Sequence, residues 1–321
     1  MKQRIYLRTC RARLSYCGPC AERRAFGCQD RYFGPLVLAC VVAGALRTRL
    51  EHRIENAVRP FLPERLKVLL RHLRFVGEQR LFRPYTQTMT IGGLSFEFFV
   101  GDKVGQRWYG ESSTRGLGPE MQFIRDRMIE PGDVAFDCGA HHGMNTILLA
   151  NWVGETGKVI AFEASPHNAA ILRKNIELNH LSQVRCENKA IAAQPGVVHM
   201  TEESNARVTL RQGLGESIEA IHIDHYVDEK PTFLKIDVEG FEVDALKGAL
   251  RVFALRPKFM IEVHTRTLTN FNTNVEELLS LIDLDAYEVW IQWEENDSPV
   301  PFKKTDRITD RVHLFGLPKA T

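Results

Sequence analysis

The sequence has 321 residues, of which 44% are hydrophobic and 26% are charged. These proportions are ordinary for a soluble globular protein, and the lack of internal repeats or low-complexity tracts excludes a solenoid or fibrous chain. The length allows one large domain, or a main domain with an N-terminal extension.

Charge is distributed unevenly along the chain. Residues 1–80 carry 17 Lys and Arg against 6 Asp and Glu, a net charge of +11. Residues 81–321 carry 25 against 34, a net charge of −9. We therefore divide the chain into a basic N-terminal extension (1–60), a segment with a helix and a hairpin (61–118) and a main domain (119–321). The charge of the extension predicts weak contact with a membrane surface.

The extension holds five of the seven cysteines, and "CGPC" at 17–20 matches a redox motif in letters only. Cys10, Cys17, Cys20 and Cys28 are candidate ligands of a zinc site. We favour an unstructured leader over this site, because only one pair of these cysteines has the short spacing of zinc ligands. The two cysteines of the main domain indicate reduced thiols and a cytoplasmic location.

Residues 33–46 form the one long apolar stretch of the sequence. Its fourteen residues are fewer than the ~20 that span a bilayer, so we predict a buried or interfacial helix. Two alternatives are a signal-peptide core and a natural chain start further along the sequence.

Hydrophobic periodicity predicts the next elements in chain order. From Glu64, "ERLKVLLRHLRF" places leucines on one face and basic residues elsewhere, which predicts an amphipathic helix. We favour docking of this helix on the main domain over membrane or partner contact. Residues 87–100 alternate in polarity around Gly92-Gly93, which predicts a β-hairpin with a two-residue turn.

The main domain alternates between predicted strands and helices, which predicts βαβ units and an α/β fold with a doubly wound, mostly parallel sheet. Residues 196–212 interrupt the alternation and predict an antiparallel excursion. No helical pattern separates the last two strands, so we expect them to pair antiparallel at the sheet edge. The strands are expected at 133–137, 158–163, 183–188, 232–237, 258–263, 286–292 and 311–316, and the helices at 119–130, 144–153, 167–180, 241–254 and 274–284.

The first strand of the main domain ends in the turn "DCGAHHG" (137–143), which faces the ligand crevice in a doubly wound sheet. Gly139 allows a sharp turn, and Gly143 allows close approach of a helix or ligand. A dinucleotide site would need a third glycine and room for phosphates, where this turn has the acidic Asp137. S-Adenosylmethionine fits better, because it has no phosphate and carries a sulfonium and an ammonium group.

The second strand ends in Glu163, 26 residues after Asp137. A carboxylate at this place can accept hydrogen bonds from both ribose hydroxyls of a nucleoside. The alternative is a solvated glutamate at a strand end. The spacing favours the ribose contact.

Four motifs together carry a resemblance: "PGDVAFDCGAHHGMNT", "VIAFEASPHNAAILRKNIELN", "ENKAIA" and "FLKIDVEGFEVDALKGA" with "PKFMIEVH". In this order they resemble the FkbM-type methyltransferases over roughly residues 85–295. The resemblance implies a class I, Rossmann-like fold that binds S-adenosylmethionine, with a seven-stranded sheet of order 3-2-1-4-5-7-6 and an antiparallel edge strand. It also implies cofactor contacts at Asp137, Gly139, Ala140, Gly143, Glu163, Ala164 and Asn188.

Acidic residues follow the fourth and fifth strands. "LKIDVEG" places Asp237 and Glu239 beside the crevice, and "IEVH" places Glu262 and His264 at the next strand end. Asp237 or His264 is a candidate general base for a hydroxyl nucleophile. Asp237, Glu239 and Glu262 are alternatively candidate ligands for Mg²⁺. Helix capping is the non-catalytic interpretation of Asp237 and Glu239.

His141 and His142 lie on the turn after the first strand. The resembling family often has Asn and an apolar residue there, so the resemblance gives histidine catalysis no support. We include His142 among the cofactor-binding residues. Stacking or hydrogen bonding to a ligand is weighed equally with a role as base, and metal binding is the least favoured interpretation.

These features predict a cytoplasmic S-adenosylmethionine-dependent methyltransferase that acts on a hydroxyl oxygen of a carbohydrate, glycolipid or natural product. The acceptor is expected to be a small molecule or glycan and not a nucleic acid, and the sequence does not define an oligomeric state. The alternatives are a dinucleotide-dependent oxidoreductase and a non-catalytic cofactor-binding module.

Overall fold

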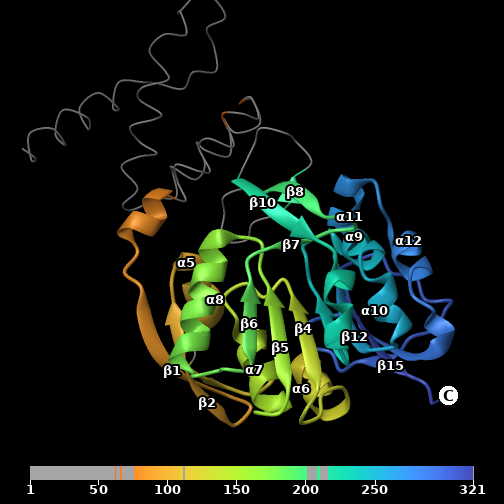
Figure 1. Ribbon diagram of the computed structural model, residues 1–321, viewed down its shortest axis with the longest axis horizontal. Helices are drawn as coiled ribbons and strands as arrows, with labels where there is room; N and C mark the ends of the chain where they lie inside the picture. The colour runs from red at the N-terminus through yellow and green to blue at the C-terminus, as the bar shows by residue number, and fades with distance from the viewer. Residues whose placement is uncertain are drawn as a thin grey trace, which may run out of the picture. The chain divides into compact units, whose positions relative to one another are not determined.

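The structure is a computed structural model that describes residues 76–110, 113–200 and 216–320, together with residues 62, 66, 208 and 209 (Figure 1). The predicted extension, its cysteines and its apolar stretch lie outside the described residues. So does all but one residue of the amphipathic helix predicted from Glu64.

The predicted hairpin is present as β1 (Tyr85–Ile91) and β2 (Leu94–Val100). Gly92 and Gly93 form its turn, and both have positive φ, as a two-residue hairpin turn of this hand requires. A short third strand, β3 (Thr114–Arg115), pairs with β1, so that β2 is an edge of this small sheet.

The outer edge of β2, which has no neighbouring strand, is covered by side chains of helix α8 (Pro166–Leu178) and of its C-cap residue. Asn175 accepts from the backbone N–H of Phe99 at 2.6 Å and donates to its carbonyl at 3.4 Å. Asn179 makes the same pair of bonds with Glu97, at 2.9 and 2.7 Å. Because the two amides lie one helical turn apart, they match alternate residues of the strand and take the place of a neighbouring strand.

The main sheet is mixed and has eight strands in the order β14-β13-β15-β12-β11-β4-β5-β6 (Figure 1). The five strands from β12 to β6 are parallel, and β15 pairs antiparallel with both β12 and β13. The predicted antiparallel pairing of the last two strands is therefore confirmed, although β15 lies inside the sheet. The strands are β4 (Val134–Cys138), β5 (Lys158–Phe162), β6 (Val184–Glu187), β11 (Phe233–Ile236), β12 (Lys258–Val263), β13 (Tyr287–Gln292), β14 (Val300–Pro301) and β15 (Val312–Pro318).

The expected count of seven strands is not met, because the two-residue strand β14 adds an outer edge beside β13. Its sequence, Val300-Pro301, is too short for a periodic pattern. Proline also lacks the N–H of an inner strand and is found at such edges.

Alternate residues of each central strand face opposite layers of the fold. On β4, Phe136 and Cys138 enter one apolar cluster, and Ala135 enters the other. The Phe136 face is covered by η2 (Ile223–Glu229), α9 (Glu242–Lys247), α10 (Leu250–Ala254) and α12 (Val275–Ser280). The Ala135 face is covered by the hairpin, α6 (Pro119–Arg127) and α7 (Met144–Val153).

Helix boundaries differ from the predictions in one informative place. The single helix expected at 241–254 is two short helices, α9 and α10, which are separated at Gly248 and Ala249. A Cβ on Gly248 would lie 2.2 Å from the carbonyl oxygen of Ala192, so only glycine fits where the two helices meet. Ala249 has non-helical φ and ψ. The helix expected at 144–153 has those bounds.

The predicted antiparallel excursion is confirmed and is longer than expected. It forms a separate four-stranded sheet of order β7-β10-β8-β9, with antiparallel pairs between β10 and β8 and between β8 and β9. The strands are β7 (Ala190–Ile191), β8 (Gly196–Met200), β9 (Val208–Thr209) and β10 (Glu216–Ile221).

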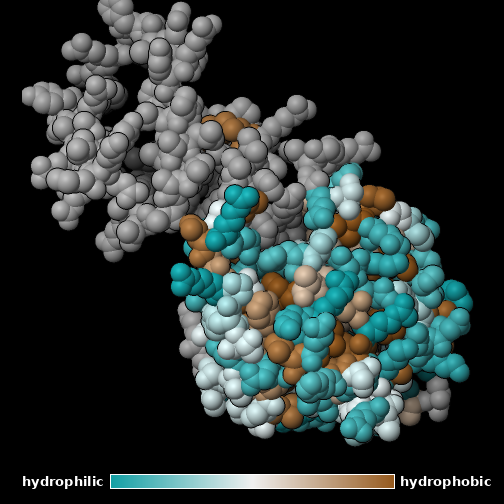
Figure 2. Space-filling view, turned by 60° about the vertical axis from the view of Figure 1, so that its left-hand side comes forward, coloured by the Kyte–Doolittle hydropathy of each residue, from teal (hydrophilic) through white to brown (hydrophobic). Residues whose placement is uncertain are grey.

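Hydrophilic side chains cover most of the face seen in Figure 2, and apolar side chains gather toward its middle. Among the described residues, we find no helix with the length and apolar character needed to cross a bilayer.

The strand order reverses at β4, and the turn after β4 lies against the end of β11. Gly139 in this turn has φ of +87°, and a Cβ there would lie 1.8 Å from the carbonyl oxygen of Asp237. Glycine is required at this position by conformation and by contact.

We therefore expect Gly139→Ala to lower the free energy of unfolding by more than ~4 kcal/mol, because the clash is with backbone that cannot move aside. Gly93→Ala is the matched control, since Gly93 has φ of +89° and open space around it. It should cost only ~1–2 kcal/mol. Urea unfolding measures both; equal losses would show that the close contact at Gly139 is not restrictive.

Candidate functional site

The turn after β4 is tied to its neighbours by backbone hydrogen bonds. The N–H groups of Gly139 and Ala140 both donate to the carbonyl of Phe162 at the end of β5, at 2.9 and 3.0 Å. Gly143 opens α7 with φ of +91°, and a Cβ there would lie 2.4 Å from Leu172 of α8. Three residues predicted to bind a cofactor are thus part of one rigid turn at the strand ends: Gly139, Ala140 and Gly143.

Glu163 connects this turn to the loop after β5. Its carboxylate accepts from the backbone N–H of His141 at 2.7 Å and of Ser165 at 2.8 Å. A weaker bond of 3.5 Å comes from Asn168. The side chain is 6% exposed, and burial raises the pKa of its carboxyl. A carboxylate has about four acceptor positions, so capacity for a ligand hydroxyl is left.

Asn188 fixes the same loop from the other side. Its amide nitrogen donates to the carbonyls of Glu163 and Ala164, both at 2.9 Å. The predicted residues Glu163, Ala164 and Asn188 therefore lie together. The sequence does not show that the Asn188 side chain reaches the backbone of these two residues.

Asp137 lies in a different environment from the one expected. Its carboxylate is fully buried and does not face a crevice. One oxygen accepts from Thr146 of α7 at 2.6 Å, and the other lies 3.4 Å from the ammonium of Lys235. The negative charge that was expected to face a ligand is compensated by a lysine of the protein.

Lys235 is a residue to which the sequence analysis gave no role. It pairs in register with Asp137 on the adjacent strand and is two residues from Asp237, so all three side chains are on one face of the sheet. Its ammonium donates to Asp237 at 3.2 Å and is buried. Although burial acts to lower the pKa of Lys235, the nearby carboxylates Asp237 and Asp137 raise it above its ordinary value. The strand register, which the sequence does not give, identifies this residue.

Asp237 is at the carboxyl end of β11, where its side chain is 26% exposed. Burial raises the pKa of its carboxyl, and this effect exceeds the opposing effect of the Lys235 ammonium. A carboxylate with a raised pKa is a stronger base than one in water. Asp237 is therefore the better base candidate on the acidic rim, the group formed by Asp237, Glu239 and Glu262 at the ends of β11 and β12.

His264 lies at the end of β12 within a group of carboxylates. Its Nδ1 lies 2.9 Å from Glu242 of α9, and its Nε2 lies 3.4 Å from Glu262 and 3.7 Å from Glu239. Burial acts to lower the pKa of His264, but the hydrogen bond and charge of Glu242 raise it to about 9. This raised pKa favours the imidazolium form, and the role of His264 as a general base stays a prediction.

Glu242 was not singled out from the sequence. It is fully buried, and the oxygen that faces His264 also accepts from the N–H of Gly240 at 2.8 Å. Glu242 is the first residue of α9, where acidic residues are common on exposed helices. The sequence pattern therefore gives no sign that it is buried.

Glu262 faces basic side chains of β15 and the loop before it. His313 and Arg311 lie 3.4 and 3.1 Å from its two oxygens. Burial acts to raise the pKa of Glu262, but His313 lowers it to about 2. Asp237 and Glu262 each already have a protein cation beside them.

The candidate metal set differs from the predicted one. Among the described residues, the ligand atoms that come together on this rim belong to Asp237, Glu262 and His264, with His264 in place of Glu239. Because Lys235 and Arg311 compensate the carboxylates, the arrangement favours acid–base chemistry over a divalent cation.

The two histidines of the turn have separate environments. His141 has φ of +51°, its Nδ1 lies 3.1 Å from the hydroxyl of Tyr109, and its ring is 4.9 Å from that of Trp108. His142 stacks on His141 with centroids 3.9 Å apart, but its side chain is fully buried. The predicted contact of His142 with a cofactor stays a prediction. Trp108 and Tyr109 belong to α5 (Lys103–Tyr109), which the sequence analysis did not predict.

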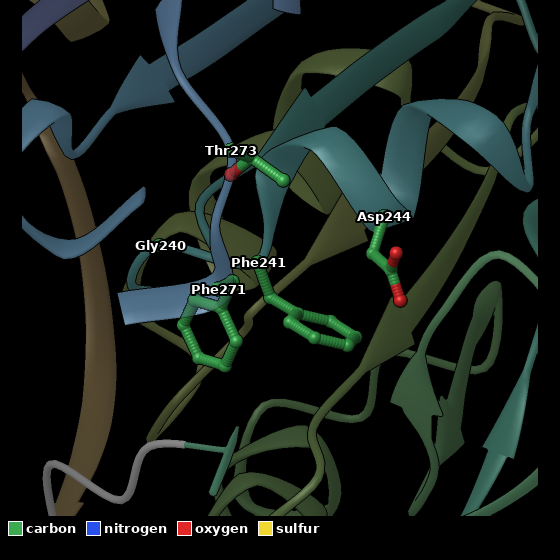
Figure 3. Close-up of a pocket in the computed structure, with 5 residues that line it drawn as sticks. All are labelled: Gly240, Phe241, Asp244, Phe271 and Thr273. Carbon is green, nitrogen blue, oxygen red and sulfur yellow. The ribbon is translucent and has the colours of Figure 1, made fainter. Parts of the chain in front are cut away.

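A cavity of about 190 Å³ adjoins the acidic rim. It is lined by the start of α9 and by η3 (Thr269–Phe271), and the rings of Phe241 and Phe271 meet edge to face at 5.0 Å (Figure 3). Gly240, another lining residue, is bonded to the same Glu242 oxygen as His264. Glu242 therefore connects the cavity to His264 beside the acidic rim.

Residues 137–290 of the chain match the methyltransferase FkbM domain. This match confirms the family resemblance over a shorter range than the residues 85–295 expected. No curated protein matches the sequence.

Three solved structures are among those similar to the chain. Methyltransferase FkbM from Methylobacillus flagellatus has 21% identity and a TM-score of 0.40, over 59% of this chain and 44% of that protein. An rRNA methylase from Streptococcus thermophilus has 12% identity and a TM-score of 0.38, over 63% and 95%. Fibrillarin from Aeropyrum pernix, in complex with S-adenosyl-L-methionine, has 9% identity and a TM-score of 0.36, over 62% and 72%. The chain thus spans less than half of the Methylobacillus protein.

The proton on His264 makes stability depend on pH. Its folded pKa of about 9 is above the ordinary 6.5, so the stabilisation is complete below about pH 6.5 and is lost as pH rises toward about 9. The difference in unfolding free energy between the wild type and His264→Gln should shrink over this range, by at most ~1.4 kcal/mol per pH unit. Urea unfolding from pH 6 to above the folded pKa measures it. A difference that does not change with pH would show that His264 is not protonated by its neighbours.

Proposed function

Since residues 137–290 are an FkbM methyltransferase domain, we propose that the protein transfers a methyl group from S-adenosylmethionine to a hydroxyl oxygen of a carbohydrate, glycolipid or natural product. One observation carries this proposal. The turn after β4, the Glu163 carboxylate after β5 and the Asp237 carboxylate after β11 lie at neighbouring strand ends, and close contacts connect them.

The residues of this structure fit S-adenosylmethionine. Glu163 keeps acceptor capacity for a ribose hydroxyl, and its two bonds to backbone N–H groups hold it in place. Gly139 and Gly143 allow the positive φ angles of the turn and its close packing against Asp237 and Leu172, and so shape the turn beside which the ligand would lie. Glu163, Ala164, Asn188 and the glycine turn would hold the cofactor.

The bound cofactor would supply an electrophilic methyl group. The protein must then position an acceptor hydroxyl and remove its proton. Asp237 is proposed as the base, because it is partly exposed at the strand end and its pKa is raised by burial. Lys235, which lies two residues earlier on β11, holds Asp237 in place through its ammonium group. His264, held by Glu242, orients the carboxylates of Glu239 and Glu262.

The cavity that Phe241 and Phe271 line is proposed to hold an apolar part of the acceptor. At about 190 Å³ it is smaller than a whole drug-sized pocket, so it would take one apolar group or the face of one sugar ring. The net charge of −9 over residues 81–321 supports a small acceptor over a nucleic acid, whose phosphates need a basic surface.

The cofactor assignment predicts that Glu163→Gln weakens binding of S-adenosylhomocysteine by ~1.5–3 kcal/mol, the range for a hydrogen bond to a charged group. Calorimetric titration measures this change, and NAD should not bind the wild type. The control is Glu187→Gln, a carboxylate at the end of the neighbouring strand β6 that is paired with Arg185. If both variants bind like the wild type, Glu163 does not contact the ligand.

The chemical assignment predicts that Asp237→Asn lowers turnover by ~10²–10⁴, the usual size of lost acid–base assistance. Affinity for S-adenosylhomocysteine should change little, because other residues hold the cofactor. Turnover is measured as S-adenosylhomocysteine formed in the presence of a panel of saccharide acceptors.

Asp133→Asn is the matched control for Asp237→Asn. Asp133 is also an aspartate paired with a lysine, at 3.6 Å from Lys258. It precedes β4 and so lies at the amino ends of the parallel strands, opposite to the end that carries Asp237. Normal turnover is expected for this control. Normal turnover in Asp237→Asn would leave positioning alone as the source of catalysis, and absence of turnover in the wild type with bound cofactor would favour a non-catalytic module.

A further inference from the structure

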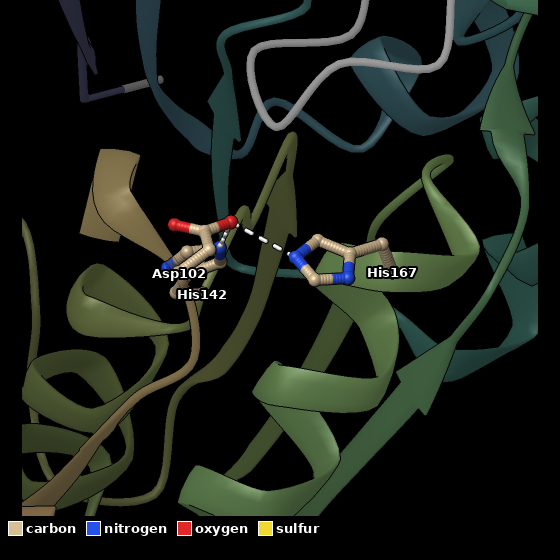
Figure 4. Close-up of side chains that lie close together, drawn as sticks. All are labelled: Asp102, His142 and His167. Carbon is tan, nitrogen blue, oxygen red and sulfur yellow. Dashed lines mark hydrogen bonds and ion pairs between the residues drawn. The ribbon is translucent and has the colours of Figure 1, made fainter. Parts of the chain in front are cut away.

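A second group of potential metal ligands lies behind the turn after β4, apart from the acidic rim. It consists of Asp102, which caps α5, His142 from the turn, and His167 from the first turn of α8. Figure 4 shows the two imidazoles directed at the same carboxylate oxygen. The Asp102 Oδ2 atom lies 2.9 Å from His167 Nε2 and 3.5 Å from His142 Nε2.

These distances suit a common metal ion. Two ligands that each lie about 2.0 Å from a tetrahedral zinc ion are about 3.3 Å apart, and the two observed separations bracket that value. The three ligand atoms all lie within 4.8 Å of one another. Two imidazoles with one carboxylate are a donor set for borderline divalent transition metals, and not for Mg²⁺ or Ca²⁺.

The ligand side chains are held in place by the surrounding protein. The other oxygen of Asp102 accepts from the N–H of Gly105 at 2.6 Å. The Gly105 contact on the oxygen that faces away from the histidines is of the kind that orients metal ligands in proteins. The ring of His142 stacks on His141, and Asn168 Oδ1 lies 3.2 Å from the His142 Nε2 atom, a contact that a bound ion would replace. Asp102 and His142 are buried, whereas His167 is 31% exposed and gives access to solvent.

The charge of this group also differs from that of the acidic rim. In the described part of the chain, the ion pairs of Asp102 are with the two histidines, and no lysine or arginine takes part. On the rim, Lys235 and Arg311 compensate the carboxylates. A buried carboxylate with no lysine or arginine beside it accommodates a bound cation without repulsion from a fixed positive charge.

From these observations we propose that Asp102, His142 and His167 bind a divalent transition-metal ion such as Zn²⁺. The ion joins α5 to the turn after β4 and to α8. The turn after β4 carries predicted cofactor contacts, and α8 begins directly after the loop with Glu163 and Ala164, so the ion has a structural role beside that site. The proposal concerns metal binding alone and does not depend on methyl transfer.

The test compares the full-length protein with His167→Gln and His225→Gln, each stripped of metal with EDTA and dialysed. Glutamine at 167 still donates a hydrogen bond to Asp102 but is a poor zinc ligand, and His225 is an exposed histidine outside both groups. Zn²⁺ is titrated by calorimetry, and the melting temperature is recorded with and without Zn²⁺. Co²⁺ absorption reports the ligand type, and all three proteins share the same cysteines.

The wild type and His225→Gln should bind Zn²⁺ with equal affinity and melt at a higher temperature when loaded. His167→Gln should bind at least ~100-fold more weakly and gain no thermal stability, while its metal-free melting temperature is unchanged. His167→Ala should repeat this result if glutamine disturbs the fold. Equal Zn²⁺ affinity in all three proteins would overturn the proposal and show that Asp102, His142 and His167 form only a hydrogen-bonded network. Loss of binding in Glu262→Gln alone would place the metal on the acidic rim and overturn it as well.

Discussion

The buried ammonium of Lys235 holds the two central strands of the sheet together at their carboxyl ends. It lies between the carboxylates of Asp137 on β4 and Asp237 after β11, at 3.4 and 3.2 Å. A buried charge is tolerated only with partners of opposite sign, so each member of this group requires the others. Beside it, the turn with Gly139 contacts the Asp237 carbonyl at the point where the strand order reverses.

Much of the fold could be predicted because it depends on local periodicity. The hairpin follows from alternation around two glycines, and the parallel strands follow from apolar runs between helical patterns. The helix break at Gly248 and Ala249 could not be predicted, since it lies where the chain packs against Ala192, 56 positions earlier. The edge strand Val300–Pro301 was equally invisible, because two residues have no period.

The candidate site divides in the same way. Residues in motifs, such as Glu163 and Gly139, could be identified from spacing, and the structure places them together. Lys235 and Glu242 could not, because their positions depend on strand register and on the packing of α9. Asp102 is 40 residues from His142 and 65 from His167, so pattern reasoning had no reason to group them.

The paired asparagines on α8 have a consequence for the behaviour of the chain in solution. An uncovered strand edge is a template on which a second chain can add by backbone pairing, and natural sheets use several devices to prevent this. Here the outer edge of β2 already has its N–H and carbonyl groups at residues 97 and 99 bonded to side chains of the same molecule. Because a helix presents these amides, the edge is protected against intermolecular association without an additional strand.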